Sequence, residues 1–494
     1  MTIIGRRNPA RTVRCIAAIA ALLAFTRCAG APDSVPTTAE HTAQIGALTV
    51  PDDPPQPDAA AEPRTAVAVI EDEPAARAPI DAAAQALAQA VAEAAEAAQK
   101  RRRMVDSALA ALSLEQLVGQ LFMPAFPVDA RGRGLLAIDD RVRRMMREIE
   151  PGGVLLVGLN VDSTDQVMRL IEDLQQTAAL PLLIATDHEG GAVSRISASG
   201  RIPATRIPSP HIVGAVADPQ LAYRLGEVIG RELRSLGIQV NFAPVADLRT
   251  NPHNSVIGDR SFGSDPETVG GIVAQLVRGM QDQHVAAVLK HFPGHGDTIE
   301  DSHYEAASVR HDQERLRHVE MVPFRRGIEA GALGVMTAHI SVPEVTGNRA
   351  PATLSPLLLG PVLRGELGFE RLIFSDALNM HALTRYYNRS QVAVLALEAG
   401  VDVLVHPERP LEAYQAVLDA VHGGVLSVER VEQSARTILE VKYDLGLLGD
   451  TAQPSGVPSL AADLSILGAE QHRAVADEIL SRFRQTQSER GGSR

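Results

Sequence analysis

The sequence predicts an α/β protein built on a (β/α)8 barrel of the TIM type. Three observations predict this fold class. Short β-rich runs alternate with longer amphipathic stretches, eight such units fit within about 340 residues, and titratable residues directly follow most of the apolar runs. The alternation is typical of parallel strands with helical crossovers. The polar residues fit a barrel, whose site lies at the C-terminal strand ends. A doubly wound open sheet is the alternative.

Composition excludes several classes of protein. With 494 residues, 45% of them hydrophobic, the chain can bury a sizeable core and is not wholly disordered. Its net charge of −13 argues against a non-specific nucleic-acid partner. Two cysteines exclude a disulfide scaffold and a multi-cysteine zinc site. The absence of Trp counts against an aromatic stacking platform for a ligand.

Residues 1–31 have the pattern of an export signal. Five arginines and no acidic residue occur in the first 28 positions, together with an apolar run from Cys15 that is too short to span a bilayer. The processing has two alternatives. A signal peptidase could cut after Ala31, although a proline follows, or Cys28 could carry a lipid that attaches the protein to a membrane, although an arginine precedes it. We expect an exported protein of the cell envelope or the extracellular space.

Residues 32–80 are expected to form a disordered linker. Repeated prolines block helices and sheet ladders, and acidic side chains outnumber basic ones by twelve to three over residues 29–100. Residues 81–104 are alanine-rich without Pro or Gly, which predicts a helix leading into the barrel.

The barrel domain is predicted to cover residues 105–449. Ser113 to Gln116 has the pattern of a capping box that opens a helix. The predicted strands are Leu121–Ala125, Val154–Val157, Leu182–Ala185, Val240–Ala243, Ala286–Leu289, Gly334–Ala338, Leu372–Ser375 and Val401–Val405. The clearest predicted helices are Thr164–Leu174, Leu221–Leu236, Val269–Gln283, Asp312–Ala330 and Arg430–Leu445.

Residues 450–494 are predicted to be a C-terminal tail. Gly446, just before it, is placed to cap the last barrel helix. A short helix is expected within the tail, from Ala469 to Phe483.

Polar residues follow the predicted strands at the edge where a barrel would bring them together. They are Asp187, Asp247, Lys290, His291, His339, Asp376 and His406. A random soluble surface would not concentrate titratable groups at these positions.

Four motifs carry a family resemblance. They are residues 290–298 with the Asp301-Ser302-His303 that follows, and residues 187–191, 258–262 and 375–380. In these motifs, and in their order from about Val105 to Gly449, the chain resembles the β-N-acetylglucosaminidase branch of glycoside hydrolase family 3. Two positions depart from that pattern: His188 stands where the family usually has Gln, and Ala192 where it usually has Arg.

The resemblance implies a retaining mechanism. Such hydrolysis needs a carboxylate nucleophile and a separate acid/base. Asp376 is implied as the nucleophile, although an Asp before Ala-Leu-Asn-Met could also cap a helix. His303 is implied as the acid/base, and Asp301, two residues earlier, would orient its ring and raise its pKa.

The resemblance also implies residues that bind the sugar. Arg195 has an alternative role in a loop-supporting salt bridge. The implied binding residues are Asp187, Arg195, Arg260, Lys290 and His291, with Asp247 and His339 as weaker candidates.

The expected function is an exo-β-N-acetylglucosaminidase acting on terminal N-acetylglucosamine of peptidoglycan fragments. The expected partner is a small sugar or muropeptide; no cofactor or metal is expected, and the oligomeric state stays open. Alternatives are a family 3 β-glucosidase, a glycoside phosphorylase and a non-catalytic envelope-tethered sugar-binding protein. A metal-dependent hydrolase would use His291, His295, Asp297 and His303, but Pro and Gly interrupt the helix that this spacing needs.

Overall fold

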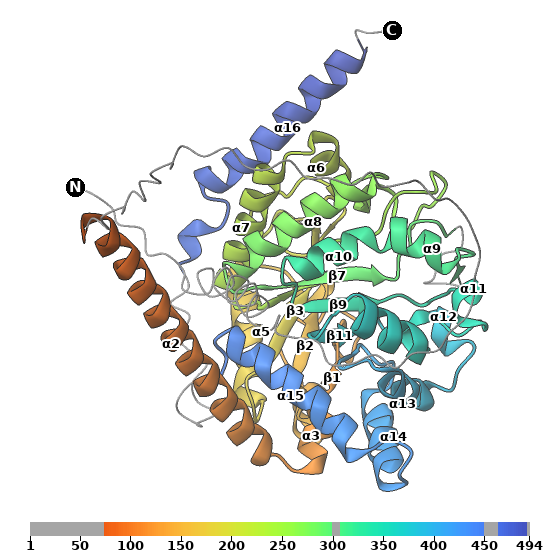
Figure 1. Cartoon of the computed structure of the whole chain (residues 1–494). Coiled ribbons are helices and arrows are strands. Elements are labelled where there is room, and N and C mark those ends of the chain that lie inside the picture. Colours follow the sequence, from red (N-terminus) through yellow and green to blue (C-terminus); the bar gives the residue numbers. More distant parts are fainter. Residues whose placement is uncertain (1–73, 299–306, 449–462, 492–494) are drawn as a thin grey trace, which may run out of the picture. The chain divides into compact units, whose positions relative to one another are not determined.

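The computed structural model describes residues 74–298, 307–448 and 463–491 (Figure 1). The predicted signal and most of the predicted linker therefore lie outside the described residues. The chain divides into two compact units, Met1–Lys100 and Arg101–Arg494. The helix predicted before the barrel is α2 (Pro74–Ala110). Among the described residues, no helix combines the length and the apolar character needed to cross a membrane.

Eight parallel strands form the centre of the second unit, and each coincides with a predicted strand. They are β1 (Phe122–Met123), β2 (Gly153–Leu156), β3 (Leu183–Thr186), β6 (Val240–Asn241), β7 (Ala286–Phe292), β9 (Gly334–Thr337), β11 (Leu372–Phe374) and β12 (Leu404–Val405). Six pair in the order β2-β3-β6-β7-β9-β11, and β1 pairs with β12. Single bridges, Ala125 with Leu155 and Phe374 with Val403, connect the two groups. The fold is thus TIM-barrel-like, and the open-sheet alternative is wrong.

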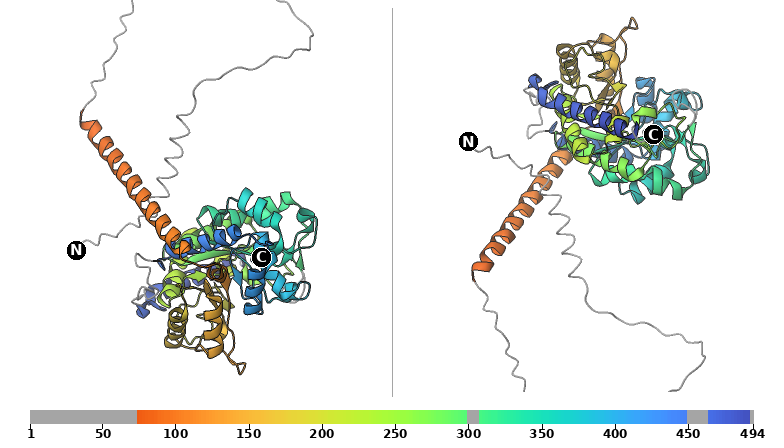
Figure 2. Two further views of the ribbon diagram at one scale, coloured as in Figure 1. Left: turned by 90° about the horizontal axis from the view of Figure 1, so that it is seen from below. Right: turned by 90° about the horizontal axis from the view of Figure 1, so that it is seen from above.

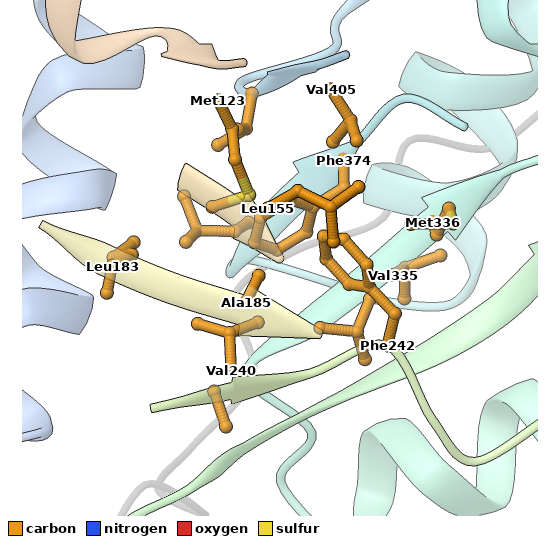
Figure 3. Close-up of a cluster of buried hydrophobic side chains, with 14 of the residues drawn as sticks. Met123, Leu155, Leu183, Ala185, Val240, Phe242, Val335, Met336, Phe374 and Val405 are labelled. Carbon is orange, nitrogen blue, oxygen red and sulfur yellow. The ribbon is translucent and has the colours of Figure 1, made fainter. Parts of the chain in front are cut away.

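Apolar side chains fill the space inside the strands. Figure 3 shows this cluster, with residues from β1, β2, β3, β6, β9, β11 and β12. Phe242 and Phe374 meet edge to face with ring centroids 5.4 Å apart. A filled interior leaves only the strand ends free to form a site.

Helices follow the strands and lie around them (Figure 2). The main ones are α3 (Leu114–Gln120), α4 (Asp140–Ile149), α5 (Thr164–Thr177), α7 (Pro219–Ser235), α8 (Pro266–Gln281), α10 (Val322–Glu329), α13 (Arg389–Ala399), α14 (Pro410–His422) and α15 (Val428–Asp444). The Ser113 capping box is confirmed, because the hydroxyl accepts the Gln116 N–H and the Gln116 side chain accepts the Ser113 N–H. Gly446 adopts φ 76° just after α15, as the predicted cap requires.

Shorter elements complete the described chain. The helices are α6 (Pro210–Val216), α9 (Gln313–Arg315), α11 (Pro343–Thr346) and α12 (His381–Thr384), with helical turns η1 (Gly158–Asn160), η2 (Gly258–Arg260), η3 (Leu316–Glu320), η4 (Ala352–Leu354), η5 (Leu358–Glu366) and η6 (Leu464–Ile466). Two strand pairs were not predicted: β4 (His188–Gly190) with β5 (Val193–Ser194), and β8 (Ala307–Ser308) with β10 (Ile340–Ser341).

The stretch predicted as one helix over Asp312–Ala330 is divided. It consists of α9, the π-helical η3 and α10, with Pro323 in the first turn of α10. Proline lacks the N–H that a continuous helix would need at that position. Hydrophobic spacing alone does not distinguish this arrangement from a regular helix.

The C-terminal helix α16 (Glu470–Gly491) packs against α6 and α7. Its anchor is the buried carboxylate of Glu232 on α7. Glu232 accepts the Thr205 hydroxyl at 2.7 Å, the Gly468 N–H at 2.9 Å and His472 Nδ1 at 2.9 Å. These bonds join the tail directly to the barrel helices.

Candidate active site

A cavity of about 700 Å³ opens at the C-terminal ends of the strands. Six of the predicted site residues line it: Asp187, Arg195, Arg260, Lys290, His291 and Asp376. They come from segments after β3, after β6, from β7 and after β11, so the topology gathers residues that lie far apart in sequence. A cavity of this size is typical of a small-molecule site.

Asp376 directly follows the buried strand β11 and is half-buried in the cavity wall. Its Oδ1 accepts the N–H of Ala377 at 2.7 Å. Burial alone would raise the pKa of Asp376, but the imidazoles of His339 and His291, the Ala377 N–H and the Lys290 ammonium outweigh it and lower the pKa. The group is therefore a carboxylate, as a nucleophile must be. The alternative role as a helix cap is not observed, since α12 begins only at His381 and its N-cap is Met380.

Lys290 lies at the centre of a charged cluster. Its ammonium contacts the carboxylates of Asp187 at 2.7 Å and Glu189 at 2.6 Å. Glu189 also accepts two hydrogen bonds from Arg260, at 2.7 and 2.8 Å. Burial alone would raise the pKa of Glu189, but Lys290 and Arg260 lower it to about 2. The cations of Lys290 and Arg260 are thus held in fixed positions at the cavity wall.

Asp247 is fully buried behind the cavity and holds the segment after β7 in place. Its Oδ2 accepts the His291 N–H at 3.0 Å and contacts His291 Nδ1 at 2.6 Å, while Oδ1 accepts the His295 N–H at 2.6 Å. Burial alone would raise the pKa of Asp247, but His291 and His295 lower it. Because a carboxylate only accepts, His291 Nδ1 carries the hydrogen. Asp247 therefore positions His291 and does not line the cavity.

Close packing explains the glycines at positions 294 and 296, which follow β7. Gly294 adopts φ 129°, and a Cβ there would lie 2.9 Å from the Cβ of Glu320. A Cβ on Gly296 would lie 1.5 Å from the carbonyl oxygen of Leu248. A side chain at either position would collide with the neighbouring segment, so these glycines permit close contact between segments.

His339 is buried beside Asp376 and does not line the cavity. It contacts the Thr353 hydroxyl through Nδ1 at 2.7 Å and the Ala377 carbonyl oxygen through Nε2 at 3.0 Å. Its place is therefore behind the candidate nucleophile.

Arg195 lines the cavity without a carboxylate partner among the described residues, and its Nε is buried with no hydrogen bond there. Its side chain lies against Gly158. The alternative of a loop-supporting salt bridge finds no partner in the described part of the chain. A guanidinium in this position has donors available for a ligand.

The candidate acid/base His303 and its neighbour Asp301 lie outside the described residues, between Thr298 and Ala307. The residues on either side of this stretch are described, and both sides are fixed by hydrogen bonds. Thr298 bonds to His295 Nδ1 at 2.9 Å, and β8 pairs with β10.

Several cavity residues were given no catalytic or sugar-binding role from the sequence. They are Glu189, His295, Asn379, His381 and His406. Burial lowers the pKa of His406 to about 4, so its ring is neutral near pH 7. Four of the five lie inside or directly beside the recognised motifs, and His406 directly follows β12. Their positions in the sequence were therefore the signal that could have identified them. His291 and His295 lie in a strand and the turn after it, so the helical spacing of a metal site does not form.

A parallel barrel with ionised side chains gathered at its C-terminal mouth has the architecture of a barrel enzyme. The family model described as "Glycosyl hydrolase family 3 N terminal domain" matches residues 113–441. The chain belongs to glycosyl hydrolase family 3 and is a glycoside hydrolase.

Relatives and solved structures agree with this assignment. The chain is 32% identical over 405 residues to beta-hexosaminidase A of Pseudoalteromonas piscicida, covering 74% of this chain and 66%, just under two thirds, of that relative. It is 37% identical over 301 residues to a beta-hexosaminidase of Nitrosospira multiformis, covering 60% of this chain and 83% of the relative. A family 3 β-N-acetylglucosaminidase structure from Paenibacillus sp. str. FPU-7 is similar with a TM-score of 0.68 and 39% identity, covering 75% of this chain and 69% of that one.

Proposed function

We propose that this chain is a retaining exo-β-N-acetylglucosaminidase that works through a glycosyl-Asp376 intermediate. The observation that carries the proposal is an ionised Asp376 at the end of β11, in one cavity with the Lys290 cluster. The relatives named beta-hexosaminidase and the neighbour named β-N-acetylglucosaminidase support the choice of sugar.

The described geometry supports the binding and attack steps of the following reaction, and the resemblance implies the proton transfers. Asp187, Lys290, Arg260 and Arg195 hold the terminal sugar by polar contacts. Asp376 Oδ1 is occupied by the Ala377 N–H, while Oδ2 has no hydrogen-bond partner among the described residues and attacks the anomeric carbon. His303 gives its proton to the leaving oxygen as that bond breaks. It then takes a proton from the water that replaces Asp376, which regenerates both groups.

A panel of aryl glycosides tests this proposal. We expect turnover of an aryl N-acetyl-β-glucosaminide well above that of the glucoside, a rate independent of added phosphate, and a first product of retained anomeric configuration. Asp376→Ala should lose turnover. Full activity of that variant would refute the mechanism, while preference for the glucoside, or a requirement for phosphate, would support the β-glucosidase or phosphorylase alternative. Binding without hydrolysis of any glycoside would indicate a sugar-binding protein.

We also propose export and a cell-wall substrate. The arginine-rich start and the apolar run that follows support export. Comparing the wild type with Cys28→Ala by cell fractionation distinguishes a lipid anchor from soluble secretion. Release of N-acetylglucosamine from purified peptidoglycan fragments would test the substrate, and no release from them would contradict this part of the proposal.

A further inference from the structure

Three buried side chains form a chain of hydrogen bonds behind Asp376. Thr337 Oγ1, at the end of β9, lies 2.8 Å from Thr353 Oγ1 on η4. Thr353 Oγ1 lies 2.7 Å from His339 Nδ1, and His339 Nε2 lies 3.0 Å from the Ala377 carbonyl oxygen. Thr337 and Thr353 have no exposed surface, and His339 is 1% exposed. We call these three residues the Thr337–Thr353–His339 relay.

The direction of the relay follows from its last acceptor. A carbonyl oxygen only accepts, so His339 Nε2 carries a hydrogen and donates it to Ala377. In the neutral ring, Nδ1 then accepts a hydrogen bond from the Thr353 hydroxyl. The Thr353 oxygen in turn accepts a hydrogen bond from the Thr337 hydroxyl. If the ring is protonated, Nδ1 donates to Thr353, whose hydroxyl then donates to the Ala338 carbonyl at 3.1 Å. The Thr353 hydroxyl can therefore hold His339 in either protonation state.

Ala377 connects this relay to the nucleophile. Its carbonyl accepts from His339, and its N–H donates to Asp376 Oδ1. The relay thus holds the carbonyl of Ala377, and the Asp376 carboxylate holds its N–H. The imidazole of His339 also contributes to the lowered pKa of Asp376.

Resting on the proposed role of Asp376 as the nucleophile, we infer that Thr353 is a positioning residue for it. The Thr353 hydroxyl holds the His339 ring, the ring holds the Ala377 carbonyl, and the Ala377 N–H fixes one carboxylate oxygen so that the other faces the anomeric carbon. Thr353 does not line the cavity, and its connection to the nucleophile runs through His339.

Thr353→Val tests the inference, because valine keeps the shape and removes the hydroxyl. We expect kcat to fall about 10- to 100-fold, since small misplacement of a reacting group has effects of this size. KM should change less than threefold, because the sugar contacts of Asp187 and Lys290 are untouched. The acid limb of kcat/KM should move to higher pH, as displacement of the imidazole weakens its effect on Asp376. Thr353→Ser, which restores a hydroxyl, should recover kcat to within threefold of the wild type.

Two further variants make the test specific. Thr186→Val is the matched control: Thr186 is a buried barrel threonine whose hydroxyl donates only to the Leu156 carbonyl, so kcat should stay within threefold. His339→Gln removes the imidazole through which Thr353 acts and should lose at least as much kcat as Thr353→Val. It also serves as the readout if Thr353→Val does not fold.

The outcomes separate the two proposals. Unchanged kcat and acid limb in Thr353→Val, or equal losses in Thr353→Val and Thr353→Ser, would overturn the positioning role while Asp376→Ala remains inactive. Full activity of Asp376→Ala would instead refute the proposed function.

Discussion

Replacing Glu189 with glutamine removes the carboxylate that Lys290 and Arg260 share, with little change in size. Against the effect of burial, Lys290 and Arg260 lower the pKa of Glu189 to about 2 in the fold, from an ordinary 4.5. Because this pKa is lowered, the carboxylate stabilises the fold above about pH 4.5, and the contribution is lost as the pH falls towards 2. The lowered pKa corresponds to a contribution of about 3 kcal/mol to the free energy of unfolding at pH 7, and to about half of that at pH 3. Removing one partner of a buried ion pair independently costs about 3–5 kcal/mol.

Denaturant unfolding of the wild type and Glu189→Gln, measured at pH 7 and at pH 3, checks this estimate. We expect the difference in unfolding free energy between the two proteins to be smaller at pH 3 than at pH 7. We also expect the variant to lose kcat/KM, because Lys290 and Arg260 are no longer held. Glu267→Gln is the control, since its contact with Arg326 is largely exposed and should be worth less than about 1 kcal/mol. A loss of stability equal at both pH values, or no loss at all, would refute the electrostatic reasoning.

Three other predictions concern groups away from this cluster. Burial lowers the pKa of Lys442 to about 7, so between pH 7 and 9 the amine stays protonated in the unfolded chain but not in the folded one. The free energy of unfolding should therefore rise by roughly 1 kcal/mol per pH unit over this range. Lys442→Met should abolish that slope in pH-dependent unfolding. His303→Ala should lose about 100-fold or more on poor leaving groups and much less on dinitrophenyl glycosides, and equal losses would argue against an acid role. Glu232→Gln should cost about 1–3 kcal/mol and speed tryptic cleavage at Arg473, whereas unchanged proteolysis would show that the tail is held elsewhere.

The strands and the position of the site could be predicted because their signals are local. An apolar run followed by a titratable residue, as at Leu372 to Asp376, shows both the strand and its functional end. All six of the main residues implied for catalysis or binding that lie in the described chain line the cavity. Four of them follow this pattern, whereas Arg195 and Arg260 come from loops. The same pattern placed His339 and Asp247 after β9 and β6.

Pairings between distant segments could not be predicted. Glu189 lies within a recognised motif, but nothing local shows that it would meet Lys290 and Arg260. Thr353 has no local signal, since its partners come from β9 and the residues after it. The same holds for the tail, whose helix follows from composition but whose docking depends on Glu232. Such contacts arise only when the barrel closes.

The charges around the cavity have a consequence for the approach of substrate. In the described part of the lining, three carboxylates, from Asp187, Glu189 and Asp376, face three cations, from Lys290, Arg260 and Arg195, so these charges balance although the chain carries −13. A neutral mouth gives little long-range attraction or repulsion, so an uncharged sugar should be captured at a rate almost independent of ionic strength. The net charge of the chain then bears on its solubility, while capture depends on diffusion and shape.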